Sequence, residues 1–190
     1  EIFKLSQDLI GSTMLCTAVK LGGRNLYTIE HLLSSMAGCG LSYIHIEVDG
    51  KEIPLLDGSA IQWVREFEEV GIKKAPKPDN FFRGINKSIL ISKDDSVIAA
   101  TPSEKTTIIS TISFPYKAIG IQSFVIDLNP KSFVEMIAPA RTFGFKDQFQ
   151  ELSELGLIKG GSLENALVCD GDKWVNPPLR FDNEPIRHKI

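Results

Sequence analysis

The pattern of apolar and polar positions predicts an amphipathic helix near the start of the chain. Apolar residues recur there with the three- and four-residue spacing of one helix face, at Ile29, Leu32, Leu33, Met36 and Ala37. Thr28 precedes this stripe as a candidate N-cap, and Gly38 with Gly40 follows it as a stop signal. We therefore expect a helix that begins near residue 28 and ends near residue 38.

The polar face of this helix carries groups that can do chemistry. It holds Glu30, His31, Ser34 and Ser35 and no Lys or Arg, so its side chains are short, as on a face that lines a cavity. A carboxylate beside an imidazole can divide the tasks of general base and metal ligand. The alternative is a surface Glu and His on an ordinary core helix. The segment alone favours that alternative, because such pairs are common.

Other patterns in the first 75 residues predict strands and a second helix. Residues 13–19 favour a strand, followed by a turn at Gly22-Gly23 and a short strand into Tyr27. Residues 43–48 alternate like a strand and precede the hairpin signal Asp49-Gly50, which leads into residues 52–56. His45 lies within that alternation and is expected to be a paired or exposed strand residue rather than a ligand.

The second helix is expected over residues 61–70, with Ile61, Val64 and Phe67 on one face. Asp57 or Ser59 is its candidate N-cap, and Gly71 is expected to end it.

A break rich in Pro and Lys at residues 75–79 indicates a domain boundary. After it, a helix opened by Asn129-Pro130 is expected to bury Phe133, Met136 and Ile137. Further strands are expected at residues 88–92, 96–102, 106–114, 122–128 and 163–169. One further helix is expected at residues 149–155. Because strands and helices recur on both sides of the break, we predict an α+β fold with two domains, 1–75 and 79–190, each with a β-sheet packed on helices.

Composition narrows the function classes. The 190 residues carry a formal net charge of -3 without a basic cluster, which argues against nucleic-acid binding. No apolar run reaches the roughly 18 residues of a membrane span. Three widely spaced cysteines, with no signal peptide, favour a reducing compartment. The chain opens on Glu1 and stops at Ile190 without a closing tail, so we expect a piece of a longer protein, incomplete at both ends.

Six stretches, taken in chain order, carry a specific resemblance to one family. They are STMLCT (12–17), TIEHL (28–32), EIPLLDGSA (52–60), ARTFGF (140–145), GGSLENA (160–166) and the stretch 179–189, which ends in RHK. Together they resemble the zinc-dependent UDP-3-O-acyl-N-acetylglucosamine deacetylases, which catalyse the committed step of lipid A biosynthesis. The stretch 174–178 is most similar to cyanobacterial and plant members.

The resemblance implies a metal-dependent amidase that hydrolyses the N-acetyl amide of this substrate, with zinc-bound water as nucleophile. Glu30 corresponds to the general base, and His31 and His188 to zinc ligands. Thr142 corresponds to the residue that hydrogen-bonds the oxyanion, and Lys189 to one that meets the phosphate side of the substrate.

A β-α-β insert at 143–168 would form the apolar passage for the acyl chain. Its substrate-binding residues would be Phe143, Ile158, Gly161, Ser162, Leu163, Ala166 and Val168. Strand alternation puts Leu163 with Leu167 on one face and Ala166 with Val168 on the other, so the passage could use both faces only if this strand were an exposed arm.

The chain also departs from the family pattern. The third zinc ligand, an Asp four residues after His188, and a later general-acid His would lie beyond Ile190. With two ligands instead of three, this chain alone is expected to be inactive. The alternative is a shortened, non-catalytic paralogue that binds a UDP-sugar or acts as an interaction domain. We further expect a monomer in the cytoplasm, or in an organelle if the source is a plant.

Overall fold

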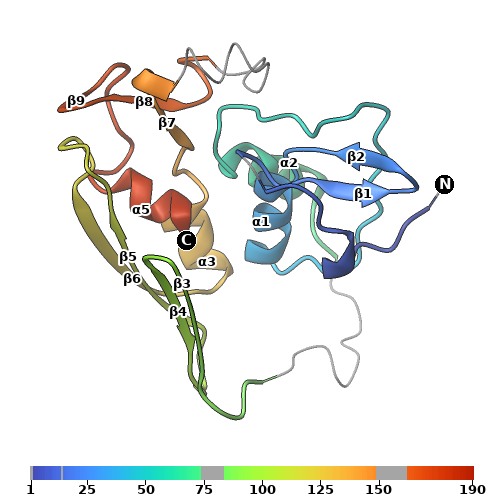
Figure 1. The fold of residues 1–190 in the computed structure, drawn as a ribbon. Coiled ribbons are helices and arrows are strands. Elements are labelled where there is room, and N and C mark those ends of the chain that lie inside the picture. Colours follow the sequence, from blue (N-terminus) through green and yellow to red (C-terminus); the bar gives the residue numbers. More distant parts are fainter. Residues whose placement is uncertain (1, 14, 74–83, 149–161) are drawn as a thin grey trace.

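The computed structural model describes residues 2–13, 15–73, 84–148 and 162–190, and it shows helices packed against several small sheets (Figure 1). The predicted α+β class is confirmed. We refer to residues 2–73 as the first half and to residues 84–190 as the second half. The expected domain boundary at 75–79 falls outside the described residues, so the division into two domains stays a prediction.

The first half contains one hairpin and two helices. A short 3-10 turn, η1 (Gln7–Leu9), precedes the antiparallel pair β1 (Val19–Leu21) and β2 (Arg24–Leu26), which turns at the predicted glycine pair. Helix α1 (Glu30–Gly38) and helix α2 (Ile61–Val70) follow. Both helices were predicted, and the bounds of α2 agree at both ends. Gly71 ends α2 with a positive φ of 85°, a conformation that glycine adopts without strain.

The second half begins with two antiparallel hairpins. They consist of β3 (Ile89–Lys93) with β4 (Ser96–Ala100), and of β5 (Thr107–Ser113) with β6 (Ile121–Asp127). All four strands were predicted to within two residues. Next comes α3 (Pro130–Ser132), which continues as a π-helical turn, η2 (Phe133–Ile137). Asn129 caps α3 through reciprocal hydrogen bonds with Ser132, so the predicted helix start is confirmed.

The last part forms a three-stranded sheet and a short helix. Strand β7 (Phe143–Phe145) pairs in parallel with β8 (Leu167–Asp170), and β9 (Lys173–Trp174) pairs antiparallel to β8. Two parallel neighbours require a crossover connection, which agrees with the β-α-β insert expected at 143–168. The helix predicted at 149–155 lies outside the described residues. Helix α5 (Glu184–Lys189) closes the chain.

Several strand predictions are wrong. Of the described residues in 13–19, only Val19 belongs to a strand, and residues 43–48 belong to none. The hairpin expected at Asp49-Gly50 is absent from this described segment, where Glu52 instead bridges Tyr27 in parallel. The predicted strand at 163–169 begins only at Leu167. Alternating side chains favour a strand, but the strand itself forms only where a neighbouring backbone completes the ladder.

The predicted N-caps of α1 and α2 are also wrong. Thr28 has a positive φ of 60°, and its hydroxyl donates to Glu52 Oε1 at 2.7 Å instead of capping α1. Neither Asp57 nor Ser59 caps α2, because the Asp57 carboxylate accepts from the Ser59 backbone N–H at 3.1 Å and hydroxyl at 2.7 Å. The short polar side chains thus stabilise the loops before the helices rather than the first helical turns.

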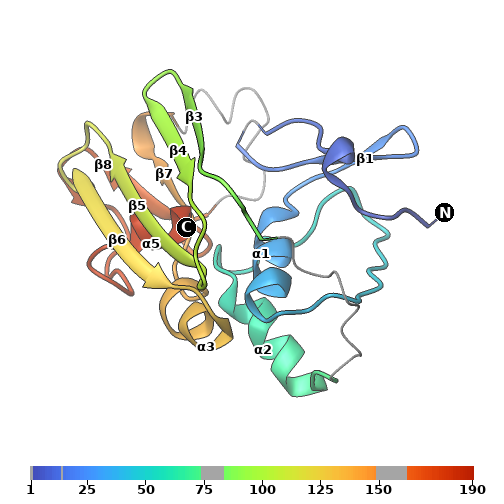
Figure 2. The ribbon, with the colours of Figure 1, turned by 90° about the horizontal axis from the view of Figure 1, so that it is seen from below.

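The two halves share a hydrophobic core. One buried cluster joins Ala60 and Val64 of the first half to Ile126, Phe133, Ile137 and Ala138 of the second. The Ala60 backbone N–H donates to the Ala138 carbonyl at 3.0 Å, which adds a main-chain contact. Figure 2 shows α1 and α2 beside α3 and η2. A second cluster, beneath α1, contains Val19, Ile29, Leu32 and Ile53. The first cluster thus joins α2 to the second half, and the second cluster packs α1 within the first half.

Gly38, at the end of α1, is a point of close approach between the halves, because a Cβ atom placed there would overlap the Phe133 ring. We therefore expect Gly38→Ala to lower the free energy of unfolding by about 1–3 kcal/mol, as overpacked core substitutions do. Urea unfolding measures this change. Gly84→Ala is the matched control, since Gly84 has open space around it and an ordinary φ. Equal stability of Gly38→Ala and the unsubstituted protein would contradict the packing described here.

Candidate metal centre

His31 and His188 lie together although they come from opposite ends of the chain. His31 stands in the first turn of α1, and His188 in the last turn of α5. Their ring centroids are 5.2 Å apart, and the rings meet edge to face at 86°. The resemblance to the deacetylase family predicted these two residues as ligands of one metal ion. The fold therefore brings the two imidazoles to one place.

The hydrogen bond of His188 fixes the tautomer of its ring. Nδ1 lies 3.0 Å from the carbonyl oxygen of Ala140. Because a carbonyl only accepts, Nδ1 carries the proton, and the lone pair is left on Nε2. Burial lowers the pKa of His188 to about 4, so the ring is neutral at pH 7. A metal-ligating histidine is usually neutral, with one ring nitrogen on the metal and the N–H of the other nitrogen donating a hydrogen bond to a carbonyl or carboxylate.

His31 is buried, with 6% of its surface exposed. Its Nδ1 is one of two buried side-chain nitrogens in the described residues without a hydrogen-bond partner. Burial lowers the pKa of His31, whereas the negative charges of Glu30 and Asp57 act in the opposite direction. A buried nitrogen without a partner costs free energy, so its presence calls for a ligand that would use the lone pair or the proton.

Glu30 precedes His31 in α1, and the first half holds its carboxylate in place. Oε2 accepts a hydrogen bond from the backbone N–H of Thr17 at 3.0 Å. The Thr17 carbonyl in turn accepts from the Ile29 backbone N–H at 3.3 Å, so the segment before β1 is tied to the start of α1. Neighbouring residues on a helix point about 100° apart. The two side chains can therefore take different roles at one site.

Thr142 lies in the link between η2 and β7. Its backbone N–H donates to the Gly58 carbonyl at 2.7 Å, and its carbonyl accepts from the Leu167 N–H at 2.8 Å. Lys189 follows His188, and its ammonium lies 5.6 Å from the centre of the Phe143 ring. Two residues expected to bind substrate, Lys189 and Phe143, thus lie close to each other. Lys189 directly follows His188 in the sequence.

The residues expected to line the acyl passage do not share one environment. Ser162 is exposed, Leu163 is 54% exposed in a turn, and Ala166 is half-buried. Val168 is 3% exposed in β8. A passage that used both faces of this strand would require an exposed arm, and β8 is not one, because it is the central strand of its sheet and is buried on both faces. Ile158 and Gly161 lie outside the described residues.

The donor set fits part of a zinc site. Two neutral imidazoles supply two of the three protein ligands that a catalytic zinc takes. Within the described ranges, no three His, Cys, Asp or Glu side chains are grouped closely enough to hold a metal ion. The unpartnered Nδ1 of His31 and the fixed tautomer of His188 nevertheless suit metal ligation.

Two arginines near the end of the chain make contacts outside the expected metal centre. The Arg180 guanidinium pairs with Asp57 at 2.7 Å. Arg187 lies over the rings of Phe124 and Phe181, at 4.2 and 4.1 Å from their centres. Local sequence offers no signal for the contacts with Asp57 and Phe124, because these residues lie far from the two arginines in the chain.

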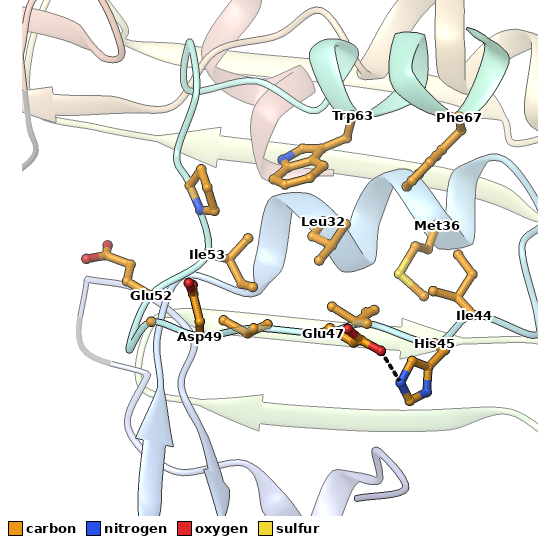
Figure 3. A pocket seen from close by; sticks show the side chains of 14 residues that line it. Leu32, Met36, Ile44, His45, Glu47, Asp49, Glu52, Ile53, Trp63 and Phe67 are labelled. Atoms are coloured by element: carbon orange, nitrogen blue, oxygen red, sulfur yellow. Dashed lines mark ion pairs between the residues drawn. The ribbon is translucent and has the colours of Figure 1, made fainter. Parts of the chain in front are cut away.

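A separate apolar groove lies between α1, α2 and residues 44–54 (Figure 3). Its volume is ≈490 Å³, and its walls include Leu32 and Met36 of α1 and Trp63 and Phe67 of α2. At its rim His45 pairs with Glu47 at 3.3 Å, so His45 is exposed and paired, as predicted, although it is not in a strand. Neither His31 nor His188 lines this groove, which is therefore distinct from the histidine pair.

A sequence profile described as "UDP-3-O-acyl N-acetylglycosamine deacetylase" matches residues 1–190. The chain belongs to this family. It is 47% identical over 185 residues to the UDP-3-O-acyl-N-acetylglucosamine deacetylase of Trichormus variabilis, covering 95% of this chain and 66% of that protein. Identity to the Synechocystis protein of the same name is 42% over 182 residues, covering 95% and 66%. The chain thus spans just under two thirds of the length of these relatives.

A plant relative supports the same placement. The protein named "Probable UDP-3-O-acyl-N-acetylglucosamine deacetylase 1, mitochondrial" of Arabidopsis thaliana is 39% identical over 191 residues, covering 93% of this chain and 59% of the relative. The resemblance to cyanobacterial and plant members is confirmed. In the described part of the chain, no helix is both long enough and apolar enough to cross a membrane.

The buried histidines give the metal-free protein a specific pH dependence. Because the pKa of His188 falls from 6.5 to about 4 on folding, the unfolded chain binds a proton more readily below pH 6.5. The stability contribution of the neutral ring is therefore complete above pH 6.5 and is lost as the pH falls toward 4. Denaturant unfolding in chelator at about pH 7.5 and about pH 5 should show a smaller loss for His188→Gln than for the unsubstituted protein. Equal losses would contradict a buried neutral His188.

Proposed function

We propose that the full-length gene product containing this chain is a zinc-dependent hydrolase that removes the N-acetyl group of UDP-3-O-acyl-N-acetylglucosamine. The observation that supports this most directly is the pairing of two neutral imidazoles, His31 and His188, together with the unpartnered buried nitrogen of His31. Family membership and the names of the relatives support the substrate and the deacetylation. The reaction would be the committed step of lipid A biosynthesis.

His31 and His188 would hold the zinc ion, together with an aspartate that the resemblance places four residues after His188. When bound, zinc would act as a Lewis acid toward the acetyl carbonyl and would lower the pKa of a water molecule. The chain prepares this role by keeping both rings unprotonated at neutral pH through burial, which lowers the pKa of each histidine. It also fixes the orientation of His188 through the Ala140 carbonyl.

Glu30 would act as the general base. A carboxylate that accepts a proton from water must lie beside the metal ligands without being one of them, and the residue directly before His31 on a helix meets this requirement. The hydrogen bond from Thr17 to Oε2 holds the carboxylate at the start of α1. The proton would therefore be taken up at a carboxylate whose position the first half determines.

Thr142, Lys189 and Phe143 would bind the substrate around the reacting amide. The Thr142 hydroxyl would donate to the oxygen that gains charge as the amide is attacked. Lys189, beside the Phe143 ring and next to His188 in sequence, would attract the diphosphate. These roles require the substrate to lie across the end of α5, where Lys189 approaches the Phe143 ring.

The acyl chain would bind over the insert at 143–168, near the exposed Ser162-Leu163 turn. Half-buried Ala166 follows this turn, and buried Val168 comes next but one, in β8. Ile158 and Gly161 belong to the same proposed passage. Each buried CH₂ group contributes about 0.8 kcal/mol, so such a passage would select substrates by acyl length.

The roles of Glu30 and His31 are tested by two substitutions in the full-length gene product. We expect Glu30→Gln to keep its zinc, measured by metal analysis after gel filtration, and to lose about 10²-fold or more in kcat. His31→Ala is expected to lose the metal. The exposed Glu47→Gln is the matched control and should change neither property. Loss of zinc from Glu30→Gln, with an unchanged rate per bound ion, would contradict the proposed division of roles.

The acyl passage is tested by Ala166→Phe, which fills the space beside the turn. KM should rise for a long-chain substrate and should stay unchanged for a short-chain analogue, because only the long chain needs the filled volume. Ala99→Phe, at an exposed position of β4, is the control for a general effect of the added ring. An equal rise of KM for both substrates would place the passage elsewhere.

A further inference from the structure

Glu184 is a fully buried carboxylate that the proposed reaction does not use. It opens α5, one helical turn before His188, and its exposed fraction is 0%. It accepts hydrogen bonds from the Arg141 backbone N–H at 2.9 Å, from Arg141 Nε at 2.9 Å and Nη2 at 3.2 Å, and from the Arg180 backbone N–H at 2.6 Å. A buried charge is retained only when it is paired and fully hydrogen-bonded, as this one is.

Helix α5 holds one short segment at two points. Glu184 binds the backbone N–H of Arg141, and His188 donates to the carbonyl of the preceding Ala140. Residues four apart on a helix lie on the same face, so both contacts are made from one side of α5. The result is a closed ring of contacts that runs through the helix turn and back through the segment. Within this ring, Glu184 restrains the rotation of α5 and with it the direction of the His188 imidazole.

Arg180 extends these contacts to the first half. Its Nη2 donates to Asp57 Oδ2 at 2.7 Å, and its Nη1 donates to Ser59 Oγ at 3.2 Å and to the Pro139 carbonyl at 2.9 Å. The loop with Asp57 and Ser59 leads into α2, in the same half as His31. One polar network therefore runs from the helix that carries His188 to the half that carries His31.

We propose that Glu184 and Arg180 are positioning residues for the candidate metal centre. Glu184 sets the orientation of the His188 ring, and the Arg180–Asp57 pair sets its position relative to His31. The two histidines belong to different halves, so no local structure can fix the geometry between them. This inference rests on the proposed zinc site and adds to it residues that touch neither metal nor substrate.

The test is the zinc affinity of the full-length gene product, measured by competition with a chelator below the unfolding temperature. Arg180→Ala and Glu184→Gln should each weaken zinc binding by about 10- to 100-fold, the range known for residues that support metal ligands. Arg180→Lys should recover part of the affinity, because lysine keeps the charge but not the fork that spans Asp57 and Ser59. Lys117→Ala, which breaks the exposed pair with Asp172, is the control and should bind zinc as the unsubstituted protein does.

A double-mutant cycle separates positioning from general damage. If Arg180 acts through Asp57, Asp57→Asn combined with Arg180→Ala should weaken zinc binding by less than the two separate effects predict. Substitution of Arg180 is less disruptive to folding, since its side chain is 36% exposed. If Glu184→Gln does not fold, the zinc affinity of Arg180→Ala tests the inference. Unchanged zinc affinity in folded Arg180→Ala would overturn the inference and leave the proposed function standing. Failure of the unsubstituted protein to bind zinc would instead overturn the proposed function, and this inference with it.

Discussion

The candidate centre depends on the contact between the two halves, because each half contributes one imidazole. That contact is apolar at its base, where Val64 of α2 is fully buried against Ile137 and its neighbours. Burial of a side chain of this size contributes about 1.5–3 kcal/mol. Gly38 allows the close approach to Phe133, so α1 lies near enough for His31 to reach His188. A hydrophobic interface thus supports a polar site at its edge.

The electrostatics of the site suit a cation. Burial lowers the pKa of both histidines, which keeps their nitrogen lone pairs available at neutral pH. The carboxylates of Glu30 and Asp57 lie near enough to His31 to act on its charge. In a partly desolvated site these negative charges would favour a divalent ion more strongly than they would in water. The same burial that makes metal-free His31 costly thereby prepares the position for a metal.

Local patterns predicted the elements that depend on local interactions. The bounds of α2 and the two hairpins of the second half agree because their apolar spacing and turn residues specify them directly. Residues 43–48 carry strand-like alternation but no strand, since a ladder needs a partner that the pattern does not encode. In β8 the buried run Leu167, Val168 and Cys169 is typical of a strand covered on both faces, a signal that alternation arguments miss.

The site itself was predictable only in part. The resemblance to the deacetylase family indicated His31 and His188, and the fold brings them together. The network of Glu184, Arg141 and Arg180 could not be predicted, because it joins loops whose proximity follows from the packing of the two halves. The ion pair of Arg180 with Asp57 likewise joins residues of different halves, so no local pattern indicates it.

The most direct test of this account is X-ray absorption at the zinc edge of the full-length gene product. We predict two imidazole nitrogens in the first shell at about 2.0–2.1 Å, the usual zinc–histidine distance, and one after His188→Ala. A first shell without imidazole, or one that His188→Ala leaves unchanged, would contradict the central claim that His31 and His188 together hold the metal.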